Sequence, residues 1–314
     1  MSMHPAFFFP GQGSQSLAML AELAAVHPQV RATFDEASET LGRDLWRLAQ
    51  EGPKAALDQT VNTQPVMLAA GVAVWRVWRE QGGAMPSVMA GHSLGEYSAL
   101  TCAGALTFED ALRLVAERAR LMQAAVPDEQ GAMAALLGLD DEVVIALCRD
   151  QALGQVLEPV NFNAPGQVVI AGEREAVERA LDAAKAVGAK RALLLPVSVP
   201  SHCALMRDAA AQLAARLEQT ELHRPSIPVL HNVNVATAES PEQIRAYLAQ
   251  QLFSPVRWVE TVQAVAERGV RLAIEAGPGK VLTGLNKRID KRLTTLPVFE
   301  PDGLSHALEA SAHV

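Results

Sequence analysis

The sequence has few cysteines, and their spacing limits what they could do. Only three occur in 314 residues, Cys102, Cys148 and Cys203, and no two of them form a Cys-x-x-Cys pair. This odd, scattered set suits neither a disulfide framework nor a zinc site, and it favours a reducing compartment. We expect Cys203 to be a small buried side chain.

Long hydrophobic segments are also missing. The longest apolar run, residues 66–75, ends at Arg76 and is far shorter than the ~20 residues that a helix needs to cross a bilayer. No basic segment precedes Phe7, and Pro10 follows it closely, so the N-terminus does not resemble a signal peptide. We therefore predict a cytoplasmic protein that makes no membrane contact.

Positive charge and aromatic side chains are scarce as well. With 27 Lys and Arg against 35 Asp and Glu, the formal net charge is −8, which argues against binding to nucleic acid. Aromatic residues make up 4% of the chain and hydrophobic residues 49%, a composition typical of an enzyme with helices packed closely on a sheet. The length allows two folding units of ~100–200 residues each.

Residues 88–100 form the most informative segment of the sequence. It consists of an apolar segment, the turn sequence Gly91-His92-Ser93-Leu94-Gly95, and a segment with helical character. The two glycines leave room where a strand and a helix would pass closest. A Gly-x-Ser-x-Gly turn between a strand and a helix exposes the serine hydroxyl near a helix N-terminus, so Ser93 is a candidate nucleophile.

The remaining pattern predicts an α/β fold. Residues 6–9 form a continuous apolar strand, and the turn after it carries Gln12 but lacks the lysine of a phosphate-binding loop. This turn is either a plain connector or a loop that faces a pocket at the end of the strand. The periodicity predicts helices at residues 28–41, 45–51, 53–59, 65–81, 107–125, 204–220, 241–252, 256–268 and 280–288, and further strands at 227–230, 270–275 and 294–298.

The pattern of predicted strands and helices changes at residue 131, which indicates an inserted domain. Strands are predicted at residues 131–139, 156–163, 167–171 and 191–197, with helices at 140–150 and 173–187. The order β-α-β-β-α-β is the split arrangement of a ferredoxin-like unit. We therefore expect a large α/β-hydrolase-like domain with a parallel-sheet core (residues 1–128 and 198–314) and an inserted ferredoxin-like small domain (residues 129–197).

Arg118 breaks the pattern of the predicted helix at 107–125. It falls within the apolar stripe that includes Leu114, Val115, Leu121 and Met122. A guanidinium that faces inward is costly unless it meets an anion. It could reach the surface or pair with a structural carboxylate. With Ser93 upstream, the carboxylate of a substrate is a credible partner.

A serine nucleophile needs a general base, and histidine is the usual one. We expect His92, the neighbour of Ser93, to brace the turn, because adjacent residues on a bend point apart. His202 and His231 remain as candidates. We favour His202, which lies in a rigid Pro-containing connection between the two domains, where clefts usually form; the alternative is that it caps the following helix. No acidic third member stands out, and a backbone carbonyl could orient the imidazole instead.

Five stretches together show a resemblance to a known family. Residues 9–15 (FPGQGSQ), 91–98 (GHSLGEYS), 161–167 (NFNAPGQ), 199–202 (VPSH) and 275–280 (EAGPGK) resemble those of malonyl-CoA:acyl carrier protein transacylases of bacterial type II fatty acid synthesis. They occur in the expected order over almost the whole chain. An HGG-type oxyanion loop, typical of esterases of the α/β-hydrolase class, is missing.

The resemblance implies a role for each matching position. Ser93 would be acylated, His202 would act as the base and Arg118 would hold the malonyl carboxylate. The backbone N–H groups of Gln12 and Leu94 would form the oxyanion hole. The main-chain carbonyl of Gln251 would orient the histidine. Three further side chains would lie in segments that line the cleft: Gln64, Asn161 and Asn163.

The implied reaction is a ping-pong transfer from malonyl-CoA to the phosphopantetheine thiol of an acidic acyl carrier protein. It needs no metal and no permanently bound cofactor, since the coenzyme A thioester is the substrate. Alternatives are a polyketide-type acyltransferase, a thioesterase or esterase, and a non-catalytic scaffold. We expect a monomer, since no exposed apolar helix stands out. The basic residues near 280–292, which include Lys287 and Arg288, are either a docking patch or a solvated helix face.

Overall fold

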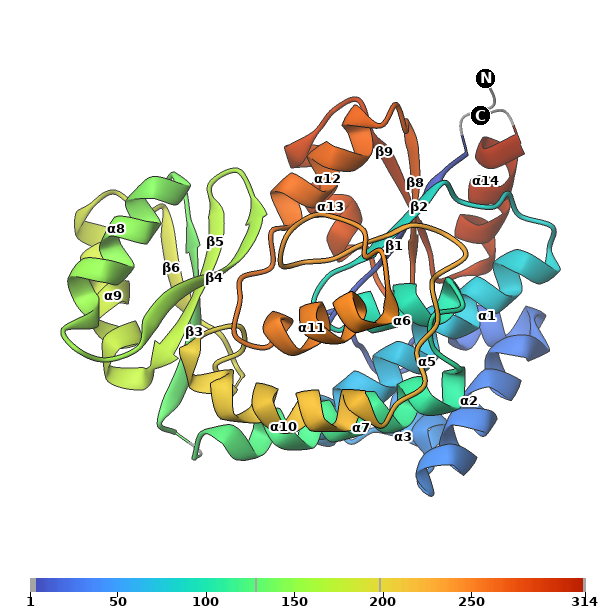
Figure 1. Cartoon of the computed structure of the whole chain (residues 1–314). Coiled ribbons are helices and arrows are strands. Elements are labelled where there is room, and N and C mark those ends of the chain that lie inside the picture. The colour runs from blue at the N-terminus through green and yellow to red at the C-terminus, as the bar shows by residue number, and fades with distance from the viewer. Residues whose placement is uncertain (1–3, 128, 198, 313–314) are drawn as a thin grey trace.

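The computed structural model describes residues 4–127, 129–197 and 199–312. Its larger part is built on a five-stranded parallel sheet (Figure 1), with the strands in the order β7-β2-β1-β8-β9. The strands are β1 (Ala6–Phe9), β2 (Val88–Gly91), β7 (Val229–Leu230), β8 (Leu272–Ala276) and β9 (Thr294–Val298). The apolar run of β1 lies at the centre, as expected for a strand that is buried on both faces.

Alternate residues of β1 pack against different helices. Phe7 contacts Trp78 on one face, and Phe8 contacts Trp258 on the other, each with ring centroids 5.2 Å apart. This alternation follows from the two-residue period of a strand. The helices of this part are α1 (Ala21–Val26), α2 (Pro28–Leu41), α3 (Leu45–Glu51), α4 (Lys54–Leu57), α5 (Thr60–Glu80), α6 (Gly95–Cys102), α7 (Phe108–Ala125), α10 (Arg207–Glu218), α11 (Pro241–Gln251), α12 (Trp258–Glu267), α13 (Val281–Ile289) and α14 (Pro301–Ala312).

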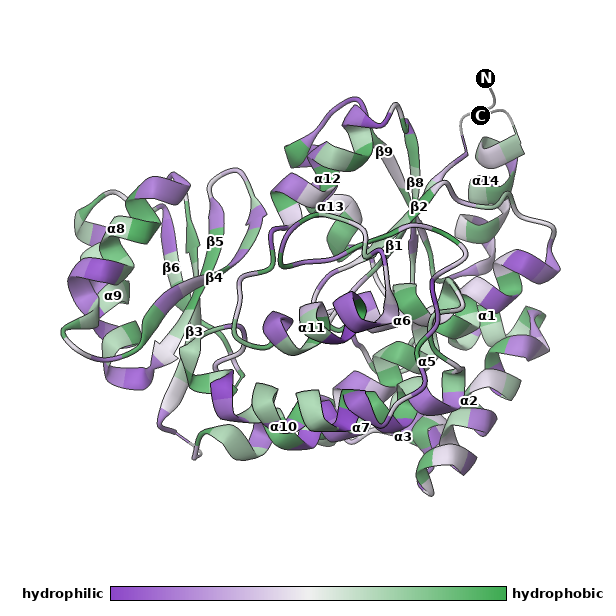
Figure 2. Ribbon diagram, in the orientation of Figure 1, coloured by the Kyte–Doolittle hydropathy of each residue, from purple (hydrophilic) through white to green (hydrophobic). Residues whose placement is uncertain are grey.

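The smaller part contains a four-stranded antiparallel sheet in the order β4-β5-β3-β6. Its elements are β3 (Gly131–Leu137), α8 (Asp141–Ala152), β4 (Leu157–Ala164), β5 (Gln167–Glu173), α9 (Arg174–Ala186) and β6 (Arg191–Leu194). Residues such as Ala134 on β3 pack with α8 and α9, whereas Met133 lies in a cluster with Cys203 of the larger part. Hydrophobic residues follow the strands of both sheets, and hydrophilic residues lie on outward-facing turns of α8 and α9 (Figure 2).

Hydrogen bonds connect the smaller sheet to segments of the larger part that lie outside the parallel sheet. The backbone N–H of Phe162 donates to Val256 O (3.0 Å), and the N–H of Val256 donates to Val160 O (2.9 Å). Arg288 adds a second connection, because its guanidinium donates to Gln167 Oε1 (2.6 Å) and Pro165 O (2.8 Å). Arg288 therefore ties α13 to the β4–β5 turn, in addition to any role at the surface.

Much of the predicted element order is observed, with β1, α2, α3 and β9 at the predicted bounds. Several predicted bounds differ by one or two residues, and three predictions were wrong by three residues or more at one end. Helix α5 begins at Thr60 rather than at Pro65; the Val61 carbonyl that Pro65 cannot bond instead accepts a hydrogen bond from Arg43 (2.9 Å). The predicted helix 204–220 starts with a 3₁₀ turn (Ala204–Met206), and β6 ends at Leu194. Helix α14 was not predicted.

The predicted domain boundaries fall partly on Asp128 and Ser198, which lie outside the described residues. Within the described ranges, none of the helices combines the length and the apolar character that a bilayer crossing requires. Cys203 is buried, as predicted.

The turn between β2 and α6 depends on close backbone packing. A Cβ atom on Gly95 would lie 2.0 Å from Phe9 O, so only glycine lets α6 start directly against β1. We predict that Gly95→Ala lowers the free energy of unfolding by about 1–3 kcal/mol in a denaturant titration. Gly284→Ala is the matched control, because its Cβ on α13 would meet nothing within 4 Å. The control should be neutral or stabilising, and equal stability of both variants would contradict the packing argument.

Candidate active site

Ser93 occupies the sharp turn between β2 and α6. Its φ of 52° lies in the left-handed region, which is strained for a residue with a side chain. The turn is fixed to the central strand, since the backbone N–H of His92 donates to Phe9 O (3.0 Å). The sequence folds this way because Gly91 and Gly95 allow α6 to pass close to β1 and β2. The result is a serine raised above the end of the sheet.

His202 faces the serine hydroxyl. The distance from Ser93 Oγ to His202 Nε2 is 2.7 Å, and His202 Nδ1 lies 2.8 Å from Gln251 O. A carbonyl can only accept, so Nδ1 carries the proton and Nε2 is free to accept the proton of the serine. A backbone carbonyl of α11 thus occupies the position at which an acidic residue orients the histidine in a Ser-His-Asp triad.

Burial sets the protonation state of His202. Its side chain is 2% exposed, and desolvation lowers its pKa to about 3, with the positive charge of Arg118 acting in the same direction. The imidazole is therefore neutral at physiological pH. It can act as a base without first losing a proton.

Arg118 projects from α7 into the same site and is 1% exposed. Its guanidinium donates to Gln64 Oε1 (2.6 Å), Gln251 Oε1 (3.0 Å) and, more weakly, Ser93 Oγ (3.3 Å). Tyr97 lies below it, with the ring centroid 5.3 Å from Cζ. Burial lowers the pKa of Arg118.

No carboxylate in the described part of the chain forms an ion pair with Arg118, and its buried Nε has no hydrogen-bond partner there. The structural carboxylate considered from the sequence is therefore not observed, and neither is an exit to the surface. The direct hydrogen-bond partners of Arg118 are neutral, and the carboxylate of Glu96 acts on it only over a longer distance. A buried cation without a directly bound anion is suited to bind an anion that comes from outside.

These groups border a cavity of about 200 Å³. Eight of the nine residues predicted for the site contribute to its wall: Gln12, Gln64, Ser93, Leu94, Arg118, Asn161, Asn163 and His202. Gln251 lies behind the wall. Apolar side chains, among them Met133, Val169 and Val197, close the other side. A more open cavity of about 730 Å³ adjoins it and shares Gln12, Thr60, Leu195 and Val197.

The predicted oxyanion-hole positions have suitable backbone groups. Within the part of the chain that the structure describes, the N–H groups of Gln12 and Leu94 donate to no other protein atom. The side chain of Gln12 donates to Thr60 Oγ1 (3.3 Å), which leaves its backbone at the cavity wall. Two unused donors beside a serine hydroxyl are what a developing oxyanion requires.

The two asparagines of β4 lie differently. Asn163 Oδ1 is 2.8 Å from His92 Nε2, so Asn163 supports the histidine that precedes the nucleophile. Burial lowers the pKa of His92, which is therefore neutral and braces the turn, as its sequence position suggested. Asn161 Oδ1 is buried without a hydrogen-bond partner among the described residues, and it lies at the cavity.

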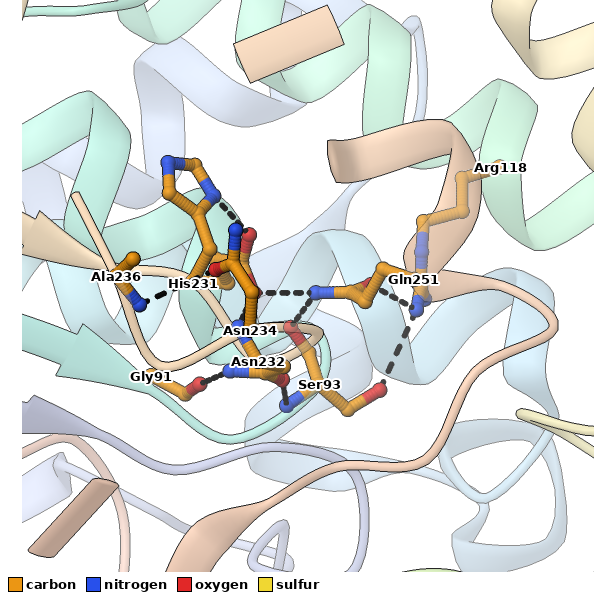
Figure 3. Close-up of polar contacts among 9 residues, drawn as sticks. Gly91, Ser93, Arg118, His231, Asn232, Asn234, Ala236 and Gln251 are labelled. Atoms are coloured by element: carbon orange, nitrogen blue, oxygen red, sulfur yellow. Dashed lines mark hydrogen bonds and ion pairs between the residues drawn. The ribbon is translucent and has the colours of Figure 1, made fainter. Parts of the chain in front are cut away.

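His231 does not act on Ser93, contrary to the alternative that the sequence left open. Its Nδ1 bonds to Glu96 Oε1 (2.7 Å), and both side chains are buried behind the turn. Sequence reasoning missed Glu96 and Asn232, which belong to this group (Figure 3). The available signal was a glutamate in the apolar segment that follows Ser93, because a carboxylate that is buried there needs several hydrogen-bond donors.

The described residues contain no group of three or more His, Cys, Asp and Glu side chains placed to hold a metal ion. The groups that converge on the cavity are a serine, a neutral histidine, two free N–H donors and a buried guanidinium. This combination is suited to acyl transfer through a serine.

The chain belongs to the acyl transferase domain family, whose sequence model matches residues 6–306. It is 57% identical over 303 residues to the malonyl CoA-acyl carrier protein transacylase of Salmonella typhimurium, with 96% of this chain and 98% of the relative covered.

Solved structures give the same result. The transacylase of the same name from Coxiella burnetii is 50% identical and superposes with a TM-score of 0.97, covering 98% of each chain. A malonyl-transacylase solved in complex with a type II PKS acyl-carrier protein is 57% identical, with a TM-score of 0.97 and coverage of 98% and 99%.

The pKa of His202 can be tested without a natural substrate. We predict that the rate constant for labelling of Ser93 by a fluorophosphonate stays nearly constant from pH 8 to pH 5.5. A lowered pKa keeps the imidazole neutral over this range, whereas an ordinary histidine with pKa ~6.5 would reduce the rate about tenfold at pH 5.5. His202→Ala, the control, should react slowly at every pH. A midpoint near 6.5 in the wild type would contradict the assignment.

Proposed function

We propose that this protein is a malonyl-CoA:acyl carrier protein transacylase that works through a malonyl ester on Ser93. The observation that carries the proposal is the buried guanidinium of Arg118, which forms no ion pair among the described residues and lies 3.3 Å from Ser93 Oγ. In malonyl-CoA, one methylene group separates a free carboxylate from the thioester carbonyl. Both ends of the group can therefore be bound at once, the carbonyl at Ser93 and the carboxylate at Arg118.

In the first half-reaction, Ser93 Oγ attacks the thioester carbonyl carbon while His202 Nε2 takes the hydroxyl proton. The carbonyl oxygen becomes an oxyanion that accepts hydrogen bonds from the N–H groups of Gln12 and Leu94. Loss of one such donor typically costs 10²–10³-fold in rate. The C–S bond then breaks, and His202 returns the proton to the departing coenzyme A thiolate.

In the second half-reaction, the thiol of the carrier's phosphopantetheine arm replaces coenzyme A. His202 takes the thiol proton, the sulfur attacks the ester carbonyl, and the proton returns to Ser93 as the C–O bond breaks. Both halves pass through the same oxyanion, so one set of donors serves both. The Gln251 carbonyl supports this cycle, because it holds the imidazole in one tautomer and stabilises its charged form.

Arg118 is proposed to select the acyl group. Its planar guanidinium can give two parallel hydrogen bonds to a carboxylate, which the ammonium of lysine cannot match. An acetyl group would leave this buried cation without an anion, so acetyl transfer should be slow. Gln64 and Gln251 hold the guanidinium in place, and Asn161 and Asn163 contribute to the cleft around it.

The wider setting follows from this function. The coenzyme A thioester is the substrate, and no permanently bound cofactor or metal has a step to perform. The expected partners are malonyl-CoA and a phosphopantetheinylated acyl carrier protein, without nucleic acid or membrane. We further propose a monomer in the bacterial cytoplasm, where fatty acid biosynthesis would use the product.

We also propose the two-domain division, with residues 1–128 and 198–314 forming an α/β-hydrolase-like domain and residues 129–197 a ferredoxin-like insertion. The strand order β4-β5-β3-β6 with two helices on one face supports the second description. The nucleophile turn between β2 and α6 supports the first.

Two classes of carrier protein are candidates to accept the malonyl group. The complex of a related malonyl-transacylase with a type II PKS carrier favours a polyketide carrier as a second candidate to the carrier of fatty acid synthesis. Both carriers offer the same thiol, so the active site alone does not separate them.

Labelled malonyl-CoA tests the proposed function. We predict that the label becomes covalently attached to the wild type, stays there without a carrier, and moves to phosphopantetheinylated carrier protein when it is added. Ser93→Ala should form no adduct. Fatty acid and type II PKS carriers, offered in parallel, identify the partner. Rapid release of free malonate would instead identify a thioesterase, and the absence of any adduct would point to a non-catalytic protein.

The role of Arg118 predicts a change in selectivity. Arg118→Ala should lower kcat/KM for malonyl-CoA by about one to two orders of magnitude, because a charge-assisted pair to a carboxylate contributes ~1.5–3 kcal/mol. The kcat/KM for acetyl-CoA should fall much less, since acetyl makes no such pair. Arg113→Ala, at an exposed position of the same helix, is the control. An equal loss for both acyl groups would contradict a selector role.

A further inference from the structure

Two side chains hold the backbone of Ser93, one on each of its polar groups (Figure 3). The Ser93 N–H donates to Asn232 Oδ1 (2.8 Å), and its carbonyl accepts from Gln251 Nε2 (3.1 Å). Neither contact takes part in the acyl-transfer steps described above. Because the Ser93 N–H donates to Asn232, it is not available to an oxyanion, and the N–H groups of Gln12 and Leu94 remain as donors.

Both contacts lead to one carboxylate. The backbone N–H of Asn232 and the Nε2 group of Gln251 each donate to Glu96 Oε2, at 2.9 Å. The second oxygen, Oε1, is bonded to His231 Nδ1 (2.7 Å). All four side chains are at most 1% exposed, so these polar groups depend on hydrogen bonds within the protein.

Asn232 also reaches the other side of the turn. Its Nδ2 group donates to Gly91 O at 2.7 Å, while Oδ1 accepts from Ser93 N–H. One carboxamide therefore spans the residues before and after His92 and fixes their separation. Removing it would leave a buried donor and a buried acceptor unsatisfied at the nucleophile.

The conformation of Ser93 gives these contacts a purpose. A φ of 52° is unfavourable for serine and persists only where the surroundings hold it. The hydroxyl must lie within hydrogen-bond reach of His202 Nε2 and beside the two free N–H donors. A small rotation of the Ser93 backbone would move Oγ away from both.

We propose that Asn232 and Glu96 are positioning residues for acyl transfer: with Gln251 and His231 they form a clamp that holds Ser93 in its reactive conformation. This inference rests on the proposed role of Ser93 as the nucleophile. The clamp does not touch the substrate. It acts on the rate of acylation rather than on the binding of malonyl-CoA, which depends on Arg118 and the cavity wall.

The test is single-turnover acylation with labelled malonyl-CoA. Asn232→Ala should lower the maximal first-order rate constant about 10²-fold, the effect of a misplacement near 1 Å, and leave the half-saturating malonyl-CoA concentration close to that of the wild type. A first-order constant does not depend on how much of the preparation is folded. A merely structural role would reduce the amplitude and leave the rate constant unchanged, which would overturn the proposal.

Asn234→Ala is the matched control. Asn234 lies in the same loop, and its Oδ1 accepts from Ala236 N–H (3.1 Å) without contacting the clamp. It should acylate at the wild-type rate. If Asn232→Ala does not fold, Asn232→Asp, which keeps Oδ1 and loses the donor to Gly91, must show the same selective loss of rate. Wild-type kinetics in that variant would also overturn the proposal.

Glu96 provides a conservative rescue. In Glu96→Gln the amide oxygen can still accept from Asn232 and Gln251, and its NH₂ group can donate to His231 once the imidazole proton moves to Nε2, which has no partner among the described residues. Glu96→Gln should therefore acylate faster than Glu96→Ala. Equal rates in these two variants would contradict the clamp.

Fluorophosphonate labelling separates failure of the clamp from failure of the proposed function. A wild type that reacts with the phosphonate but forms no malonyl adduct would contradict the proposed function. A wild type that reacts with both reagents, together with clamp variants that react equally fast, would contradict the clamp alone.

Discussion

The strained backbone of Ser93 is the constraint on which the rest of the site depends. It arises because α6 starts directly against β1 and β2, where two glycines remove the side chains that would block the approach. A turn this tight raises the hydroxyl above the sheet and leaves the next N–H free. Its cost is met by hydrogen bonds from behind, mainly through Asn232 and Gln251. The position of the Ser93 hydroxyl therefore depends on the same residues that pack α6 against the sheet and bond the turn from behind.

Gln251 connects the chemical functions of the site. Its carbonyl orients His202, its side-chain oxygen holds Arg118, and its NH₂ group supports Ser93 and Glu96. Because the proposed base (His202), selector (Arg118) and nucleophile (Ser93) all contact this residue, their positions are coupled. The arrangement also accounts for the missing acidic member of a triad: a carboxylate next to His202 would pair with Arg118 and occupy the place of the substrate's anion.

Part of this could be predicted from the sequence. The turn at Ser93, the inward position of Arg118 and the bounds of α2 and α7 all follow from local patterns, which are set by neighbouring residues. The long-range contacts could not be derived in this way. The approach of His202 to Ser93 needed a choice between candidates, and the clamp joins residues 96 and 232, more than one hundred positions apart. Helix α5 was shortened in the prediction because proline is common in the first turn of a helix. Pro65 instead lies inside α5, where Arg43 bonds the carbonyl that proline leaves free.

We propose that Ser93 carries a malonyl ester during turnover, with its carboxylate at Arg118. Acid quenching of the wild type with malonyl-CoA, followed by proteolysis and mass spectrometry of the peptides, tests this directly. We expect one malonylated position, Ser93, with no comparable adduct when acetyl-CoA is used. A malonyl group on a cysteine or lysine, or equal modification by both thioesters, would contradict it.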